Sequence, residues 1–176
     1  ACSATEDGPW SFATTFRTVC GIYTIPYYED FESYSAGTAA TIDPCWTKGT
    51  NSTTAYPYPN NVASYLIGGQ RYLYFYGYQP STASSTPYYS YIALPEFNVG
   101  LDSLAVSFKM RRYSTTSNYY TSRLLVGVMT DPTDISTFVG IDTIDLKDSA
   151  ASALVDIEVN LNSYTGTGKH IALYDA

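Results

Sequence analysis

The chain has 176 residues, a length that suits one β-sandwich domain with a short appendage and is too short for two independent cores. Charged residues make up only 14% and apolar or aromatic residues 45%, which excludes an intrinsically disordered chain. The net charge of −7 opposes binding to a phosphate backbone or an anionic membrane, so we expect no nucleic-acid partner and no direct membrane insertion.

Alternation of apolar and polar residues predicts strands along most of the chain, and no stretch has the apolar spacing of a helix. The first predicted strand, 9–20, is edge-like and carries Trp10, Phe12 and Phe16. Further strands are predicted at 71–78, 88–97, 103–111, 124–131, 136–146, 154–161 and 168–174. Turn-forming clusters separate them, which indicates an all-β fold: an antiparallel β-sandwich of jelly-roll or Greek-key type.

The predicted strands also indicate which side chains are buried. Strands 103–111 and 154–161 alternate strictly, so one face of each is expected to face the core. Asp156 and Glu158 then lie on a solvated face. Strand 124–131 is the most uniformly apolar and suits a central position in its sheet. Its Gly127 predicts a bulge or a close neighbour.

Three cysteines in a chain rich in Ser, Thr and Tyr predict an oxidising, extracytoplasmic location with one disulfide. Their spacing leaves open which pair forms it. A structural zinc site is not expected, because the chain has a single histidine and no CxxC motif.

Tyrosines on predicted loops are the candidate contact residues, because no pleated neighbour explains an aromatic side chain there. Such rings stack on sugars or pack against proteins while their hydroxyl stays wet, although on a strand they simply cover the sheet. Basic residues flank the second loop and form a positive spot suited to an acidic glycan or subunit: Lys109, Arg111, Arg112 and Arg123. The candidate ligand-binding residues are Tyr56, Tyr58, Tyr113, Asn118, Tyr119, Tyr120 and Arg123.

Two carboxylates share one face of an extended segment, Asp30 and Glu32, and such a pair suits a hard cation such as calcium. The same residues fit solvated acids beside a buried Phe31 equally well. Asp131 and Asp134 are expected to form turns, because Asp side chains accept hydrogen bonds from nearby backbone groups.

The sequence predicts no enzymatic activity. His170 is the only histidine and no GxSxG elbow is present, so a catalytic triad is not expected. Two acids from different strands acting in glycoside hydrolysis are the remaining catalytic alternative.

Motifs in a defined order resemble the cleaved-adhesin and MAM-like "choice-of-anchor J" domains of Bacteroidota surface proteins. The opening segment 25–47 contains Tyr28-Glu29-Asp30-Phe31-Glu32 and then Pro44-Cys45-Trp46-Thr47. The segments 124–146 and 160–174 are similar to later strands of these domains. The resemblance covers about residues 22–175 and is carried by the order of the motifs.

The resemblance implies a domain division. Residues 1–21 resemble the closing strands of a fibronectin type III domain, and 22–176 form the adhesin-like sandwich. Domains of this kind end with a further strand beyond the segment that matches 170–174, so this sandwich is expected to lack its last strand. Either the chain is a fragment, or a neighbouring chain donates the strand, with the amino-terminal tail as the donor.

The resemblance also implies specific pairings. If residues 10–18 close a fibronectin-like hairpin, Cys2 lies too far from Cys20 for a disulfide, which favours Cys20–Cys45. Related domains hold calcium near the position of Asp30 and Glu32, with further ligands from the carboxy-terminal region, where Asp175 is the candidate.

Together these features predict a non-catalytic, extracellular or cell-surface adhesion module of a larger bacterial protein that binds a glycan or a protein. The alternative is a structural subunit or repeat of a surface filament that self-associates by strand exchange. A host protein or a neighbouring surface protein is the expected partner, and calcium the expected cofactor.

Overall fold

The fold is that of a computed structural model, which describes residues 20–38, 40–52, 57–75, 88–112, 123–146, 148–150 and 153–175. These residues form antiparallel strands and short 3₁₀ helices, with no α-helix among them. The 3₁₀ helices are η1 (Ala63–Tyr65), η2 (Leu101–Ser103) and η3 (Ile135–Thr137). The all-β prediction is therefore confirmed, whereas the strand expected at 9–20 lies outside the described residues except for its last one.

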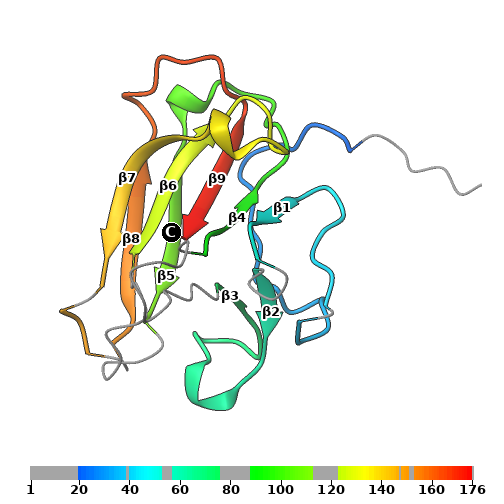
Figure 1. Cartoon of the computed structure of the whole chain (residues 1–176), viewed down its shortest axis with the longest axis vertical. Coiled ribbons are helices and arrows are strands. Elements are labelled where there is room, and N and C mark those ends of the chain that lie inside the picture. The colour runs from blue at the N-terminus through cyan, green and yellow to red at the C-terminus, as the bar shows by residue number, and fades with distance from the viewer. Residues whose placement is uncertain are drawn as a thin grey trace, which may run out of the picture.

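The larger layer is a five-stranded antiparallel sheet with the order β1-β4-β9-β6-β7 (Figure 1). Its strands are β1 (Thr47–Thr50), β4 (Ser90–Ala93), β6 (Arg123–Met129), β7 (Val139–Asp145) and β9 (His170–Asp175). The uniformly apolar β6 lies between β9 and β7, as its composition predicts, because a strand with neighbours on both sides loses most of its contact with solvent.

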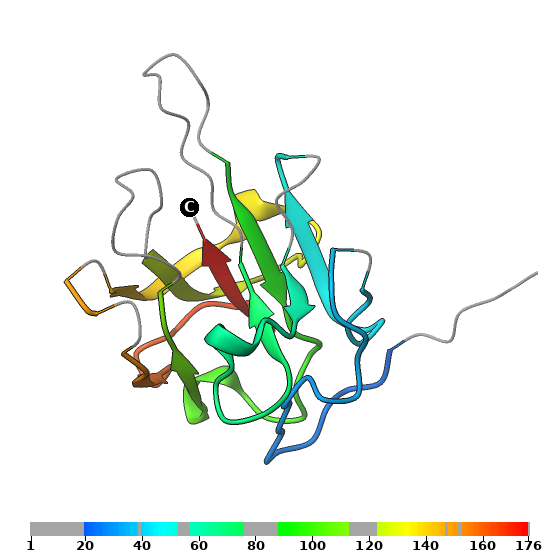
Figure 2. The same ribbon diagram turned by 90° about the horizontal axis from the view of Figure 1, so that it is seen from below.

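The second layer consists of two separate ribbons. One pairs β5 (Ala105–Met110) with β8 (Val155–Asn160), and the other pairs β2 (Tyr58–Asn60) with β3 (Tyr72–Tyr74). Both ribbons lie on the same side of the five-stranded sheet, apart from each other (Figure 2). The sandwich is thus continuous in one layer and divided in the other.

Alternation along β9 assigns its side chains to the two faces of the sheet. Ile171 and Leu173 point toward the ribbons, whereas Ala172 and Tyr174 point away from them. A strand in the middle of a sheet that is covered on both sides needs apolar residues on both faces, and β9 has them.

The core between the layers forms where the β5–β8 ribbon covers β6, β7 and β9. Val126 and Val128 of β6 meet Val159 and Leu161 from the β8 segment, and all four are buried. Phe108 and its alternating neighbours on β5 pack against this core, whereas Lys109 and Asp156 face outward. The inward and outward faces predicted for 103–111 and 154–161 are therefore confirmed.

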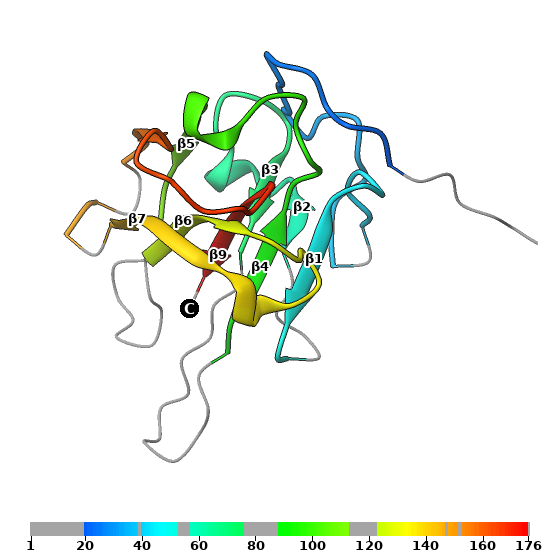
Figure 3. The ribbon, with the colours of Figure 1, turned by 90° about the horizontal axis from the view of Figure 1, so that it is seen from above.

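The segment between β6 and β7 covers the opposite face of the sheet near β4 (Figure 3). Phe138 packs there against Tyr174 with ring centroids 5.2 Å apart. Asp131 Oδ1 accepts hydrogen bonds from the backbone N–H and the hydroxyl of Thr133, which lower the pKa of Asp131, and Asp134 caps η3 through Ser136 N. Both aspartates act as the turn formers expected from the sequence.

Gly127 lies at an irregularity of the β6–β7 pairing, where the register shifts between Val126 and Gly127. A Cβ atom at this position would lie 2.3 Å from the carbonyl oxygen of Val139 and 2.6 Å from the Phe138 ring. The predicted bulge and the predicted close neighbour are both present.

Gly127→Ala is therefore expected to lower the free energy of unfolding by about 1–3 kcal/mol, because backbone atoms of β7 must move to make room for the methyl group. Gly140→Ala is the matched control on the adjacent strand, since its nearest contact would be an ordinary 3.7 Å. Denaturant unfolding of both variants measures the difference. Equal stability of the two would contradict the close approach.

Candidate binding cleft

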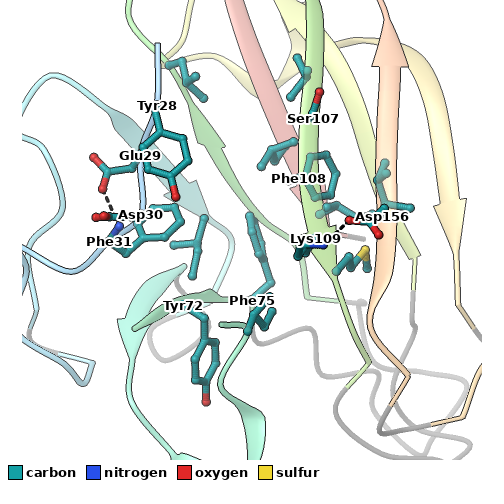
Figure 4. A pocket seen from close by; sticks show the side chains of 18 of the residues that line it. Tyr28, Glu29, Asp30, Phe31, Tyr72, Phe75, Ser107, Phe108, Lys109 and Asp156 are labelled. Atoms are coloured by element: carbon teal, nitrogen blue, oxygen red, sulfur yellow. Dashed lines mark hydrogen bonds and ion pairs between the residues drawn. The ribbon is translucent and has the colours of Figure 1, made fainter. Parts of the chain in front are cut away.

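An open cleft separates the two ribbons of the divided layer, with β3 on one side and β5 on the other (Figure 4). Its volume is about 1510 Å³, larger than the roughly 300–1,000 Å³ of typical small-molecule sites. Ile171 and Leu173 of the five-stranded sheet line it as well, together with Leu94, which directly follows β4.

The walls of the cleft are mostly apolar. Phe108 and Met110 line it from β5, and Leu73 and Phe75 from the β3 side. All four side chains are only partly buried, although each packs against a core cluster on one side. Monomeric soluble proteins rarely leave a large apolar surface of this kind open to solvent, so its presence indicates an interaction site.

A tight turn before β1 forms one rim. Glu29 Oε1 accepts a hydrogen bond of 2.6 Å from Phe31 N, and Asp30 Oδ1 accepts one of 3.0 Å from Glu32 N. Phe31 has a φ of 64°, which is unusual for a residue other than glycine. Its ring meets Trp46 edge-on at 6.1 Å, so packing holds the strained backbone in place. Tyr28, next to this turn, is 83% exposed.

Glu32 joins this rim to the β2–β3 ribbon. Its Oε1 atom accepts hydrogen bonds from the backbone N–H groups of Gln70 (2.6 Å) and Arg71 (2.9 Å). Arg71 Nε in turn donates to the Tyr34 carbonyl at 3.2 Å. These bonds hold the rim turn against the chain that leads into β3, so the turn and β3 form one wall of the cleft.

Behind the rim, tyrosine hydroxyls are held by carboxylates. Tyr23 Oη donates to Asp43, and Tyr34 Oη donates to Glu29 Oε2 at 2.9 Å. Burial, followed by these hydrogen bonds, raises the pKa of the Tyr23 and Tyr34 hydroxyls. Burial is also the largest cause that raises the pKa of Tyr27 to about 12. These tyrosines are therefore neutral anchors at physiological pH and not acid–base groups.

The disulfide links Cys20 to Cys45 with their Cα atoms 5.4 Å apart, as the resemblance implies. Cys45 N also donates a 2.8 Å hydrogen bond to Asp43 Oδ1. The backbone of Tyr23 donates to Glu96 O and accepts from Asn98 N. The chain is thus fixed to the domain immediately before it reaches the rim.

Basic side chains gather where β5 ends. Arg111 Nη1 donates to Ser64 O at 2.9 Å, and its guanidinium lies 5.3 Å from the centre of the Tyr65 ring. Lys109 forms an ion pair with Asp156 across the β5–β8 pair. Arg112 and Arg123 also line the cleft there, so the positive spot expected from the sequence lies at one end of the cleft.

The predicted ligand-binding residues are placed only in part. Arg123 begins β6 and lines the cleft, and Tyr58 lies in β2 with its ring 5.4 Å from that of Tyr74. The remaining five lie outside the described residues: Tyr56, Tyr113, Asn118, Tyr119 and Tyr120. Sequence reasoning missed Tyr28 as a contact candidate, although its place beside an acidic turn was a usable signal.

The three predicted calcium ligands, Asp30, Glu32 and Asp175, all line the same cleft. Asp175 is buried at the end of β9, opposite Ser90. In the part of the chain that the structure describes, no three acidic, histidine or cysteine side chains come close enough to hold a metal ion. The hydrogen bonds of Asp30 and Glu32 stabilise the turn and its contact with the chain that leads into β3.

The polar groups considered for catalysis have structural partners. His170 Nδ1 lies 2.8 Å from the Leu94 carbonyl oxygen. Asp156 pairs with Lys109, and Glu158 lies 3.4 Å from Asn160 Nδ2 on the solvated face of β8. The solvated-face interpretation of these acids is confirmed.

These observations define an antiparallel two-layer β-sandwich with an apolar cleft in its divided layer. The same fold is found in the K1 cleaved adhesin domain of Lys-gingipain from Porphyromonas gingivalis W83, with a TM-score of 0.57, 18% identity and coverage of 84% of this chain and 85% of that one. The K2 cleaved adhesin domain of Lys-gingipain matches with a TM-score of 0.56, 13% identity and coverage of 82% and 85%.

These similarities support the cleaved-adhesin part of the resemblance at the level of the fold. No family model and no curated protein matches the chain. The assignment to the choice-of-anchor J or MAM-like group and the domain division at residue 21 stay predictions. Among the described residues, no helix has the length and apolar character needed to span a membrane.

Proposed function

We propose that this domain is a non-catalytic, extracellular adhesion module of a bacterial surface or secreted protein, and that it binds a protein or glycan at the cleft between β3 and β5. The open apolar cleft beside the exposed Tyr28 carries this proposal. The two structural neighbours named as cleaved adhesin domains support it, as does the disulfide, which suits an oxidising location.

The cleft favours an extended partner over a compact small molecule. Its volume exceeds that of typical small-molecule pockets, and two strand edges border it. A polypeptide segment would gain main-chain hydrogen bonds from these edges and place alternate side chains on the apolar floor. A glycan chain would instead stack on a rim tyrosine.

Tyr28→Ala is expected to weaken binding of the partner at least tenfold without changing the melting temperature. Little of this side chain is buried, so its removal costs contact with the partner and almost no packing. Glycan arrays and a panel of immobilised extracellular proteins identify the partner, and titration of both proteins measures the change. Val139→Ala, at an exposed apolar position on β7, is the control and should bind as the wild type does.

The loop tyrosines are proposed as a second contact surface for the same partner. A variant with Tyr113, Tyr119 and Tyr120 all changed to Ala tests this in the same titration. Undiminished binding by the triple variant, together with loss of binding in Tyr28→Ala, would assign recognition to the cleft rim alone. Loss of binding in the triple variant, together with undiminished binding by Tyr28→Ala, would overturn the cleft as the binding site.

A second function is favoured by the strand edges on either side of the cleft, along which no further described strand pairs. A domain with such edges suits a structural subunit or repeat of a surface filament that is assembled by strand exchange. Self-association and binding of an outside partner then use the same cleft.

Calcium binding is a separate proposal, supported by the neighbouring carboxylates of Asp30 and Glu32 on the rim turn; Asp175 lines the same cleft but forms no group of three with them among the described residues. Calcium is expected to raise the melting temperature and a chelator to lower it, because a ligand that binds only the folded state stabilises it. Differential scanning fluorimetry measures both shifts in the wild type. The same measurement on Asp30→Asn should show smaller shifts. A melting temperature that moves with neither addition would contradict bound calcium.

A further inference from the structure

We infer that the cleft accepts residues 9–19 of a second copy of this chain as an added β-strand between β3 and β5. The inference deepens the proposed function, because it rests on the same cleft and names a partner segment for it. The inference requires a strand edge on the acceptor that no other described strand covers, a matching pattern on the donor and a geometry that favours transfer between copies.

The acceptor has strand edges on both sides of the gap. Among the described strands, β5 pairs only with β8 and β3 pairs only with β2. The edge of β5 that faces away from β8 and the edge of β3 that faces away from β2 both border the cleft. The six-residue β5 offers the longer edge, and a strand edge that no described strand covers is a template for another strand.

The floor and walls provide an apolar surface for one face of the added strand. Leu94, Leu173 and Met110 line the cleft, as do Phe75 and Phe108 from its two sides (Figure 4). In a complete sandwich a strand at this place would send every second side chain toward these residues.

The donor segment has the required alternation. In the sequence PWSFATTFRTV, residues 9–19, the side chains of Trp10, Phe12 and Phe16 fall on one face of an extended strand. Arg17, the one charged residue of the segment, falls on the other face. At about 3.3 Å per residue, eleven residues reach about 36 Å, which exceeds the length of the six-residue β5.

Charge favours one direction for the donated strand. Arg111 and Arg112 directly follow β5, and Arg123 lines the same end of the cleft. Glu6 and Asp7 precede the aromatic part of the donor segment. The acidic end meets the basic end when the segment runs antiparallel to β5, which is also the commoner form of strand pairing.

The fixed path of the chain before the rim favours a second copy as the donor. The disulfide at Cys20 and the backbone hydrogen bonds of Tyr23 hold this part of the chain in place. The described chain begins on the β1 side of the molecule, away from β5, in all three views (Figures 1, 2 and 3). The described chain thus begins away from the cleft, which favours a neighbouring copy over the same chain as the donor.

The first experiment measures self-association of the full chain by sedimentation velocity over a range of concentrations. The wild type is expected to form dimers or longer assemblies, and the variant Phe12→Ser/Phe16→Ser to be monomeric. Ala13→Ser/Thr15→Ser, on the opposite face of the donor segment, is the matched control and should assemble as the wild type does. A wild type that is monomeric throughout would overturn the inference, as would assemblies that persist in Phe12→Ser/Phe16→Ser.

The second experiment uses Phe12→Ser/Phe16→Ser as the acceptor, because its own segment cannot compete. A labelled peptide of residues 9–19 is expected to bind it and to slow amide hydrogen exchange in β3 and β5. The same peptide with Phe12 and Phe16 changed to Ser, or an acceptor that also carries Phe75→Ser, should bind at least tenfold more weakly. Protection that falls outside β3 and β5 would overturn the inference.

The two experiments separate this inference from the proposed function. Peptide binding with self-association, but with no partner on the glycan and protein panels, would support strand donation and contradict adhesion to an outside partner. Panel binding without self-association would support adhesion and overturn strand donation. Peptide binding by a chain whose wild type remains monomeric would show that the segment fills its own cleft, which also overturns donation between copies.

Discussion

Replacing Cys20 and Cys45 together with Ser is expected to lower the free energy of unfolding by about 3.5 kcal/mol, because the disulfide closes a long loop. The two cysteines are 25 residues apart in the sequence, so the bond removes much conformational freedom from the unfolded chain. The bonded pair also holds the segment that leads to the rim turn. Chemical denaturation of the double variant under non-reducing conditions measures the loss.

Two controls separate the disulfide from other effects of the substitutions. Cys2→Ser should unfold as the wild type does, because Cys2 has no part in this bond. Reduced wild type should show a midpoint close to that of the double variant, since both lack the same constraint. A double variant as stable as the oxidised wild type would contradict a stabilising role of the bond.

Leu161→Ala is expected to lower the free energy of unfolding by about 3 kcal/mol, within the range of buried leucine truncations. Leu161 is fully buried between the β5–β8 ribbon and the five-stranded sheet. Its backbone N–H donates to Leu104 O at 3.0 Å, so the surrounding chain is not free to collapse into the space left behind. Urea unfolding measures the change.

Leu154→Ala is the matched control, because this leucine precedes the same strand and is 43% exposed. Its truncation should change the stability by less than about 0.5 kcal/mol, as is usual for surface positions. Similar losses in the two variants would contradict the position of Leu161 in the core. The contrast also tests the inward and outward assignment of β8 directly.

The sequence was most informative where one face of a strand meets the core. In 154–161 every second residue is apolar, and in β8 the same residues face the five-stranded sheet. When one side of a ribbon is solvated and the other is covered, period-two alternation determines which side chains face the core, because a shift by one residue would expose all the apolar ones. The same physical reason explains why β5 was predicted correctly over 105–110.

Strands whose pairing depends on distant residues could not be predicted. The segment Thr47–Thr50 has no apolar alternation, yet it forms β1 along β4. Gly49 makes this possible, because a Cβ there would lie 2.4 Å from the Tyr91 ring on β4. That contact links residues 42 positions apart, and no local pattern reports it.

The cleft could not be predicted from the sequence either. It exists because β3 and β5 belong to separate ribbons that do not pair with each other, and no local pattern reports that. The motif at residues 28–32 was identified as acidic and aromatic, but its role in the rim depends on the left-handed backbone of Phe31 and on the bonds from Glu32 to β3. The bonds from Glu32 reach residues 38 and 39 positions away in the sequence, which no local pattern reports. The prediction of the loop tyrosines, by contrast, rests only on their aromatic side chains and their place on predicted loops.

The central position of β9 bears on how the domain withstands mechanical load. Because β9 lies between β4 and β6, tension along this strand would shear the hydrogen bonds of both neighbours at the same time. Bonds loaded in parallel share the force, whereas a strand at the edge of a sheet can be peeled off one bond at a time. Forced unfolding is governed by the rate of crossing this barrier, so a domain of this topology is expected to resist a force applied along β9.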